Sequence, residues 1–165
     1  MISIIVCIAE NNAIGYKGNL LYKLRDDLKN FKTLTTNHTV IMGRKTFESL
    51  PNGALPHRRN IVLTHGNETW KGTETFPSLE KALDSCVDDG EVFIIGGSSV
   101  YKDALPLANR LYLTIVHDTP EEADTFFPDY EKEEWEESLW KYHPADEKND
   151  KDFSFVVLNR KRESN

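Results

Sequence analysis

Asp27 stands at a position where an ionisable side chain is unexpected. The apolar residues around it, Leu24, Leu28 and Phe31, recur with helical spacing. At about 100° per residue, Asp27 falls between them on the apolar face, whereas Asp26 falls on the opposite face, toward water. A carboxylate on an apolar face needs a partner, and burial there predicts a pKa above that of an exposed aspartate. That partner is either a polar ligand that needs an acceptor, or a helix cap or a side chain from a distant strand.

Two predicted strands end at glycine and lead into short helices, an arrangement that suits phosphate groups. The glycine-led segments are Gly43-Arg44-Lys45-Thr46 and Gly96-Gly97-Ser98-Ser99. Glycine lets a phosphate approach the backbone, and a helix N-terminus offers N–H groups to it. Two such segments together predict a pyrophosphate site, with Arg44, Thr64 and His65 available for a further phosphate. Each segment alone is a weak signal, and Gly96-Gly97 is also consistent with an ordinary tight turn between a strand and a helix.

Other well-known ligand and catalytic motifs are absent from the sequence. Position 38, where a P-loop would need its first glycine, is histidine, so a Walker-type kinase is excluded. No G-x-G-x-x-G follows the first strand, and the sequence contains no H-E-x-x-H, no G-x-S-x-G and no Cys/His cluster with metal-ligand spacing. The sequence therefore predicts no metal site.

Strands and helices alternate along the chain, which predicts an α/β fold in a single domain over residues 1–165. We expect strands at residues 2–9, 39–42, 60–64, 91–95, 111–117 and 153–161, helices at residues 24–35, 44–50, 78–87 and 98–104, and a long loop at residues 11–23. This order predicts a mostly parallel, twisted sheet of about eight strands, flanked by helices on both faces. The last two strands have no strongly predicted helix between them, so they predict an antiparallel C-terminal edge.

The charge distribution points to a small anionic ligand. The net charge of −7 argues against general binding of nucleic acid. Residues 1–65 nevertheless hold nine Lys and Arg against four Asp and Glu, whereas the remainder holds 11 against 23. A basic region on an acidic protein suits an anionic ligand, although an ordinary mixed surface would give the same count.

The cysteines and the first apolar run indicate a protein of a reducing compartment. Cys7 and Cys86 have neither disulfide nor metal-ligand spacing. Residues 2–9 are too short to span a membrane and follow no basic leader. We therefore expect no membrane partner and a location in the cytoplasm.

Short stretches along nearly the whole chain match one known family in their order and spacing. They are Met1-Ile2-Ser3-Ile4-Ile5, Ala13-Ile14-Gly15, residues 24–31, Val40-Ile41-Met42-Gly43-Arg44, Thr46-Phe47-Glu48-Ser49, Leu55-Pro56, Arg58-Arg59-Asn60-Ile61, Ile94-Ile95-Gly96-Gly97, Val100-Tyr101, Leu111-Tyr112-Leu113-Thr114, Asp124-Thr125 and Phe127-Pro128. No single stretch is decisive, but the set is highly specific. The chain resembles the bacterial-type dihydrofolate reductases.

The resemblance implies that NADPH reduces 7,8-dihydrofolate to 5,6,7,8-tetrahydrofolate, in support of one-carbon metabolism and thymidylate synthesis. Asp27 would bind the 2-amino and N3 edge of the pterin, supported by Thr114, and Asp27 and Tyr22 would serve catalysis. Arg58 would grip the α-carboxylate of the glutamate tail as a bidentate pair. Hydride would pass from nicotinamide C4 to pterin C6, and N5 would take a proton from water. The other implied substrate-binding residues are Ile5, Cys7, Leu28, Phe31, Lys32, Leu50, Leu55 and Ile95.

The resemblance also implies where NADPH binds. The two glycine-led segments would hold its pyrophosphate, with a cis peptide between Gly96 and Gly97, and Arg44, Thr64 and His65 would bind its 2′-phosphate. The implied cofactor-binding residues are Ala9, Ile14, Gly15, Asn19, Leu20, Gly43, Arg44, Lys45, Thr46, Leu63, Thr64, His65, Gly96, Gly97, Ser98, Ser99, Val100, Tyr101 and Thr125. Antifolate inhibitors are further implied ligands, and a monomer is the implied state.

The chain departs from the family pattern near the predicted site. Leu21-Tyr22 stands where the family usually has Pro-Trp, Arg25 replaces a common proline, and Ala123 replaces a frequent glycine. Tyr22 keeps an aromatic body and a polar tip, so a conserved role and neutral drift fit equally well.

Two other functions stay open. Another NADPH-dependent pterin or flavin-precursor reductase of this fold would lack the pair of Asp27 and Arg58, which this chain keeps. A non-catalytic module that binds folate or NADPH has only the change at Leu21-Tyr22 in its support.

Overall fold

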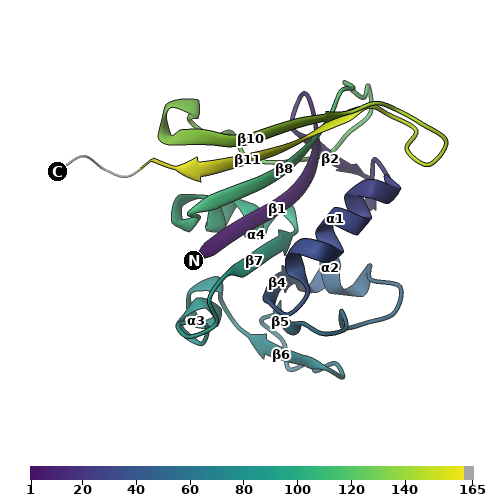
Figure 1. Cartoon of the computed structure of the whole chain (residues 1–165). Coiled ribbons are helices and arrows are strands. Elements are labelled where there is room, and N and C mark those ends of the chain that lie inside the picture. The colour runs from purple at the N-terminus through teal and green to yellow at the C-terminus, as the bar shows by residue number, and fades with distance from the viewer. Residues whose placement is uncertain (162–165) are drawn as a thin grey trace.

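The central feature of the fold is an eight-stranded sheet (Figure 1). The computed structural model describes residues 1–161, so residues 162–165 of the predicted domain lie outside the described residues. The strands of this sheet are β1 (Ile2–Ala9), β4 (Thr39–Gly43), β5 (Arg59–Leu63), β6 (Thr73–Phe76), β7 (Val92–Gly96), β8 (Arg110–Val116), β10 (Trp135–His143) and β11 (Phe153–Arg160). Their order is β10-β11-β8-β1-β7-β4-β5-β6.

The direction of the strands confirms the predicted fold class. β1 runs parallel to both β7 and β8, and β4 runs parallel to β5 and β7. β11 is antiparallel to β8 and to β10, which makes the C-terminal edge antiparallel as expected. A central parallel strand is covered on both faces, and β1 accordingly carries apolar side chains at nearly every position.

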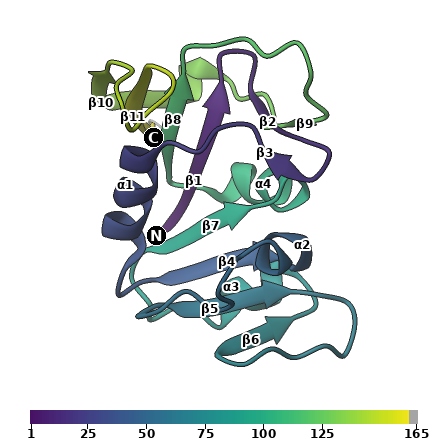
Figure 2. The same cartoon turned by 90° about the vertical axis from the view of Figure 1, so that its right-hand side faces the viewer.

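Helices cover both faces of the sheet (Figure 2). α1 (Arg25–Thr35) and α2 (Arg44–Glu48) pack through Phe31 and Phe47 on the face that carries Ile5. α3 (Leu79–Asp84) and α4 (Ser98–Ala104) pack on the opposite face, against Ile4 and Ile94. Successive residues of β1 therefore contribute to two separate cores, as the alternation of side chains along a strand requires. Two short 3₁₀ helices span Leu105–Leu107 and Lys132–Glu134.

Several predicted boundaries were wrong. The predicted loop at residues 11–23 contains β2 (Ala13–Tyr16) and β3 (Asn19–Leu20), which form a second sheet with β9 (Thr125–Phe126). β6 and β10 were missed because both are polar edge strands, and β10 is exposed at most positions. α2 ends at Glu48 rather than at residue 50, and α3 ends at Asp84 rather than at residue 87. Hydrophobic periodicity does not reveal strands whose side chains contact few other residues.

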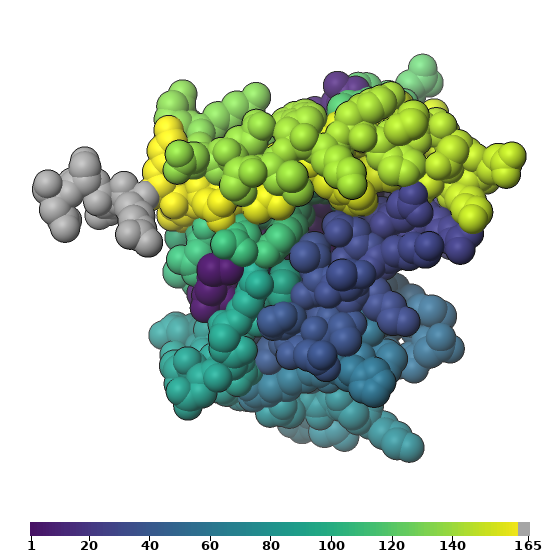
Figure 3. Space-filling model, viewed as in Figure 1, coloured from purple at the N-terminus to yellow at the C-terminus, as the bar shows by residue number. Residues whose placement is uncertain are grey.

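The hairpin of β10 and β11 reaches the N-terminal end of α1, the helix that carries Asp27. The space-filling view shows its connecting loop against that end of the helix (Figure 3). Asn149 in this loop is completely buried, and it bonds to the backbone of α1. Within residues 1–161, no helix is long and apolar enough to cross a membrane.

Candidate active site

Asp27 finds its protein partner on a distant strand. The Thr114 hydroxyl on β8 donates a hydrogen bond to Asp27 Oδ1 at 2.5 Å. Burial raises the pKa of Asp27 above its ordinary value of 3.8, and the bond from Thr114 opposes that rise. The predicted direction of this pKa is therefore confirmed. Thr114 satisfies one carboxylate oxygen, and the other oxygen accepts no hydrogen bond from residues 1–161.

Two predictions about the surroundings of Asp27 were wrong. Asp26 does not face water alone, because its carboxylate lies 2.8 Å from His143 Nε2 and accepts a bond from Asn149 at 3.3 Å. Leu28 was placed on the buried face, yet it is 59% exposed. The helix period could not show that nothing in the described chain covers Leu28. An exposed leucine beside a partly buried carboxylate offers an apolar surface to a ligand.

Five of the residues assigned to substrate binding come together in one apolar cluster. They are Ile5 of β1, Phe31 of α1, Leu50, Leu55 and Ile95 of β7. Cys7 packs nearby, beside Leu24, and its thiol has a raised pKa because of burial and the neighbouring charge of Asp27. Lys32 is exposed on α1. A planar, mostly apolar ligand bonded to Asp27 would meet this cluster with its rings.

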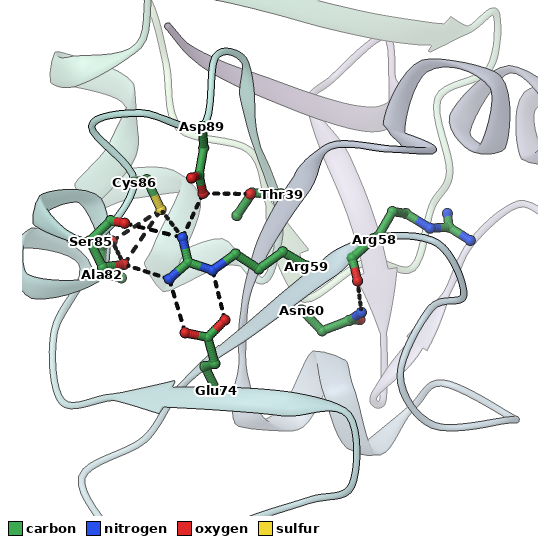
Figure 4. A network of polar contacts seen from close by, with 9 residues as sticks. All are labelled: Thr39, Arg58, Arg59, Asn60, Glu74, Ala82, Ser85, Cys86 and Asp89. Carbon is green, nitrogen blue, oxygen red and sulfur yellow. Dashed lines mark hydrogen bonds and ion pairs between the residues drawn. The ribbon is translucent and has the colours of Figure 1, made fainter.

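Arg58 and Arg59 are neighbours in the sequence, but only Arg59 lies within a network of ion pairs (Figure 4). Arg59 forms a two-bond pair with Glu74 at 2.7 and 2.9 Å, and it lies 2.6 Å from Asp89. The Arg58 guanidinium points away from this network, donates to Pro56 O at 2.9 Å and to Thr35 Oγ1 at 3.0 Å, and has no ion pair within residues 1–161. Burial lowers the pKa of Arg58. Arg59 is thus held by the fold, whereas Arg58 retains capacity for an anionic ligand.

The turn before β5 is shaped by Asn60, which is buried. Its side chain accepts from Leu55 N at 2.8 Å and donates to Leu55 O and Arg58 O at 2.9 and 3.0 Å. These bonds fix the backbone of Leu55 and Arg58. The apolar contact at Leu55 and the cation at Arg58 are therefore positioned by one asparagine.

The two glycine-led segments meet as predicted. Met42 at the end of β4 pairs with Gly96 at the end of β7, and the peptide between Gly96 and Gly97 is cis, as expected. A Cβ added to Gly96 would lie 3.3 Å from Thr46 Oγ1, and one added to Gly97 would lie 3.4 Å from the same atom. Gly96 also has a φ of +134°, a backbone conformation that residues with side chains rarely adopt, so glycine is required at this position.

A groove of about 730 Å³ opens beside these segments. The predicted cofactor residues that line it are Gly43, Arg44, Lys45, Thr46, Leu63, Thr64, His65, Gly97, Ser98, Ser99 and Val100. Neither α2 nor α4, which begin here, has a side-chain cap, so their first N–H groups remain available to a phosphate. Arg44, Lys45, several hydroxyls and these N–H groups are suitable partners for phosphate groups, although two carboxylates, Glu68 and Asp103, also line the groove.

The remaining predicted cofactor residues lie outside this groove. Gly15 of β2 pairs with Leu20 of β3 and with Thr125 of β9, which joins three of them in the second sheet. The Tyr101 hydroxyl is buried and donates to Ile5 O at 3.0 Å, which links α4 to β1. The others are Gly96 at the end of β7, Ala9 at the end of β1, and Ile14 and Asn19, which lie on β2 and β3 of the second sheet.

Comparison with known proteins identifies the family. The family model for dihydrofolate reductase matches residues 1–160. Dihydrofolate reductase type 3 of Salmonella typhimurium is 44% identical over 164 residues, which cover 98% of this chain and 99% of that relative. The dihydrofolate reductase of Bacillus subtilis (strain 168) is 39% identical over 165 residues, with 99% and 97% covered. The chain belongs to the dihydrofolate reductase family.

A solved structure supports the same assignment. The dihydrofolate reductase from Enterococcus faecalis, complexed with NADP(H) and RAB-propyl, superposes with a TM-score of 0.90. It is 35% identical in sequence, and the match covers 98% of this chain and 97% of that chain. The fold and the family therefore agree with each other along almost the whole described chain.

Asn149 was missed by sequence reasoning, although it caps the helix that carries Asp27. Leu24 at the N-cap of α1 has no side-chain oxygen, and Asn149 Oδ1 instead accepts from Asp26 N at 3.1 Å. Asn149 Nδ2 donates to Asp146 at 3.0 Å. A cap supplied from 123 residues away has no local sequence signal.

We expect Asn149→Ala to destabilise the fold. The change removes a cap and leaves buried polar groups unpaired, which together cost about 1–3 kcal/mol. Urea unfolding of this variant should show the loss, and the exposed Asn52→Ala should stay within about 0.5 kcal/mol of the parent. Equal stability of the two variants would mean that Asn149 does not cap α1.

Tyr22, which the resemblance assigns to catalysis, bonds to the turn that follows β8. Its hydroxyl donates to Asp118 Oδ2 at 2.7 Å, and burial together with this bond raises its pKa. Asp118 also accepts from Glu10 N through its backbone. The tyrosine therefore ties the segment before α1 to the turns that follow β1 and β8.

We expect Tyr22→Trp to change kcat several-fold without loss of folate binding. The larger ring repacks the segment beside Asp27 but removes no group assigned to hold the substrate. Steady-state rates and folate titrations of Tyr22→Trp and Tyr22→Phe would separate the contribution of the aromatic ring from that of the hydroxyl. Identical kinetics for the tryptophan variant and the parent would show that the departure at this position is neutral.

Proposed function

We propose that Asp27 and Arg58 hold 7,8-dihydrofolate in this chain while it is reduced to 5,6,7,8-tetrahydrofolate, the reaction of the family. The observation that carries this proposal is the position of Asp27. It is a carboxylate of raised pKa, bonded to Thr114 and placed beside an apolar cluster. A pterin offers flat ring faces that can pack against the apolar cluster, and N–H donors that can bond to the carboxylate.

Asp27 acts on the substrate rather than on NADPH, the hydride donor. Its carboxylate accepts from the 2-amino group and N3 of the pterin, which fixes the ring and raises the proton affinity of N5. Water delivers the proton to N5. Thr114 holds one oxygen of Asp27 in place, and the residues of the apolar cluster exclude other water from the rings.

Arg58 anchors the opposite end of the substrate. Its guanidinium has the fork geometry that suits a carboxylate, and its bonds to Thr35 and Pro56 restrict its orientation. The ion pair with the α-carboxylate of the glutamate tail fixes the distance between the tail and the pterin. Arg58 therefore acts on affinity more than on the chemical step.

The groove between β4, β5 and β7 receives NADPH. When bound, NADPH supplies the hydride that pterin C6 accepts. Lys45, Thr46 and the first N–H groups of α2 and α4 hold the pyrophosphate, and Arg44 and Thr64 hold the 2′-phosphate. His65 lies exposed on the same rim and adds a donor there.

Three further features belong to the proposal. Antifolates that imitate the pterin edge bind at Asp27, since the same acceptor serves both. The chain acts as a monomer, and light scattering tests this. It works in the cytoplasm, which agrees with its two free cysteines, Cys7 and Cys86.

Loss of absorbance at 340 nm tests the function. The purified chain should oxidise NADPH when dihydrofolate is added, and should do so far more slowly with other oxidised pterins or with flavin precursors. Oxidation with another pterin but not with dihydrofolate would favour the related reductase. No oxidation above background would favour a binding module.

A further inference from the structure

Glu68 places a carboxylate between the two residues that we assign to the 2′-phosphate. Its Oε1 lies 3.3 Å from Arg44 Nη1, and its Oε2 accepts from the Thr64 hydroxyl at 3.0 Å. The Thr64 hydroxyl in turn accepts from Gly66 N at 3.2 Å. In the cofactor-free chain, an anion supplied by the protein therefore already uses the partners that a phosphate would need.

The loop between β5 and β6 is shaped around this carboxylate. A Cβ added to Gly66 would collide with the carboxylate atoms of Glu68, so only glycine lets the side chain fold back over the loop. The pKa of Glu68 lies below its ordinary value because the carboxylate accepts from its own backbone N–H and from Thr64 and lies beside Arg44. Glu68 is consequently charged at neutral pH and acts as an anion.

We infer that Glu68 occupies the 2′-phosphate position in the cofactor-free protein and thereby weakens the preference of the chain for NADPH over NADH. This inference rests on the proposed function, which places the 2′-phosphate at Arg44 and Thr64. To bind there, the phosphate must displace Glu68 from both partners and then stay close to a second negative charge.

NADH has no 2′-phosphate, so it can bind beside the same loop without displacing Glu68. Its ribose carries a 2′-hydroxyl, which can donate a hydrogen bond to a carboxylate. Acidic residues recognise the 2′-hydroxyl of NAD in this way in other dinucleotide-binding folds. Glu68 is thus a specificity-determining residue that opposes one cofactor and tolerates the other.

The solvent exposure of Arg44 and Glu68 determines how strongly Glu68 weakens NADPH binding. The side chains of Arg44 and Glu68 are 46% and 44% exposed, so solvent screens their attraction and the exchange is reversible. We therefore expect the carboxylate to compete with the phosphate rather than to block it. Its removal should tighten NADPH binding by about three- to tenfold.

Glu48 provides a matched control. Its carboxylate lies 3.5 Å from Arg44 Nε, one turn along α2, and its side chain is 53% exposed, against 44% for Glu68. It forms no bond to Thr64 within residues 1–161. Glu48→Gln removes the same charge beside the same arginine but leaves the phosphate position occupied.

Calorimetric titration of the cofactor-free chain tests the inference without reference to turnover. The Kd values for NADPH, NADH, adenosine 2′,5′-bisphosphate and AMP are compared among the parent, Glu68→Gln and Glu48→Gln. We expect Glu68→Gln to tighten NADPH and the bisphosphate by about three- to tenfold, with NADH and AMP unchanged or weaker. Glu48→Gln should change each Kd by less than about twofold.

Two results would overturn the inference while leaving the proposed function intact. One is a parent that binds NADPH with the same Kd as Glu68→Gln. The other is an equal gain in both variants, which would reveal a general effect of charge. A parent that binds neither dinucleotide would contradict the proposed function itself, and the inference would fall with it.

Discussion

Asp27→Asn is expected to lower kcat for dihydrofolate by about 10²–10³-fold at neutral pH, with partial recovery in acid. The amide cannot supply the negative charge that raises the proton affinity of pterin N5. At low pH, solvent protonates the substrate before hydride transfer, so the variant depends less on residue 27. Rates measured from pH 5 to pH 8 should rise toward acid for the variant. A loss that is the same at every pH would mean that Asp27 acts in binding alone.

Stability of the same variant provides the control for misfolding. Burial raises the pKa of Asp27 in the folded chain above its ordinary value of 3.8. The carboxyl therefore stabilises the fold most at pH values below 3.8, and this contribution is lost as the pH rises through the raised pKa. At pH 7 the asparagine variant should be at least as stable as the parent toward urea. A large loss of stability would show that the ionised carboxylate is needed by the fold.

Arg58→Gln is expected to raise KM for dihydrofolate by about 10- to 100-fold and to leave kcat within a few-fold of the parent. A charge-assisted bidentate pair contributes about 1.5–3 kcal/mol to binding, which corresponds to this range. The KM for NADPH should not change. Steady-state kinetics with each substrate varied in turn measures all three quantities.

Two controls separate the role of Arg58 from that of its neighbour. Dihydropteroate lacks the glutamate tail, so Arg58→Gln should bind it as well as the parent does. Arg59→Gln should instead destabilise the fold, because Arg59 joins β5 to Glu74 and Asp89. Equal loss of affinity for both ligands in Arg58→Gln would contradict the assignment of the tail to Arg58.

The parts of the site that lie at the ends of parallel strands were predictable from sequence. Gly43 and Gly96 each follow a buried apolar strand, and the carboxyl ends of such strands meet at one edge of the sheet. Their pairing through Met42 and Gly96 follows from that rule. The unusual position of Asp27 was also visible, because the helix period is a local property.

The parts that depend on contacts between distant residues were not predictable from periodicity. Asp26 was expected to face water, but His143 at the end of β10 and Asn149 in the loop that follows both contact its carboxylate. Glu68 lies in an exposed polar loop, where no period marks a position as special. Such contacts depend on where the edge strands place their loops. Polar edge strands such as β10 show little hydrophobic periodicity, so their positions are hard to predict.

The central claim is that this chain reduces dihydrofolate by hydride transfer from NADPH, and the fate of an isotope tests it most directly. NADPH that carries two deuterium atoms at nicotinamide C4 would be incubated with dihydrofolate and the purified chain, and the product analysed by mass spectrometry and NMR. We expect tetrahydrofolate with one deuterium at C6 and a solvent-derived proton at N5. Absence of tetrahydrofolate, or tetrahydrofolate without deuterium at C6, would contradict the account.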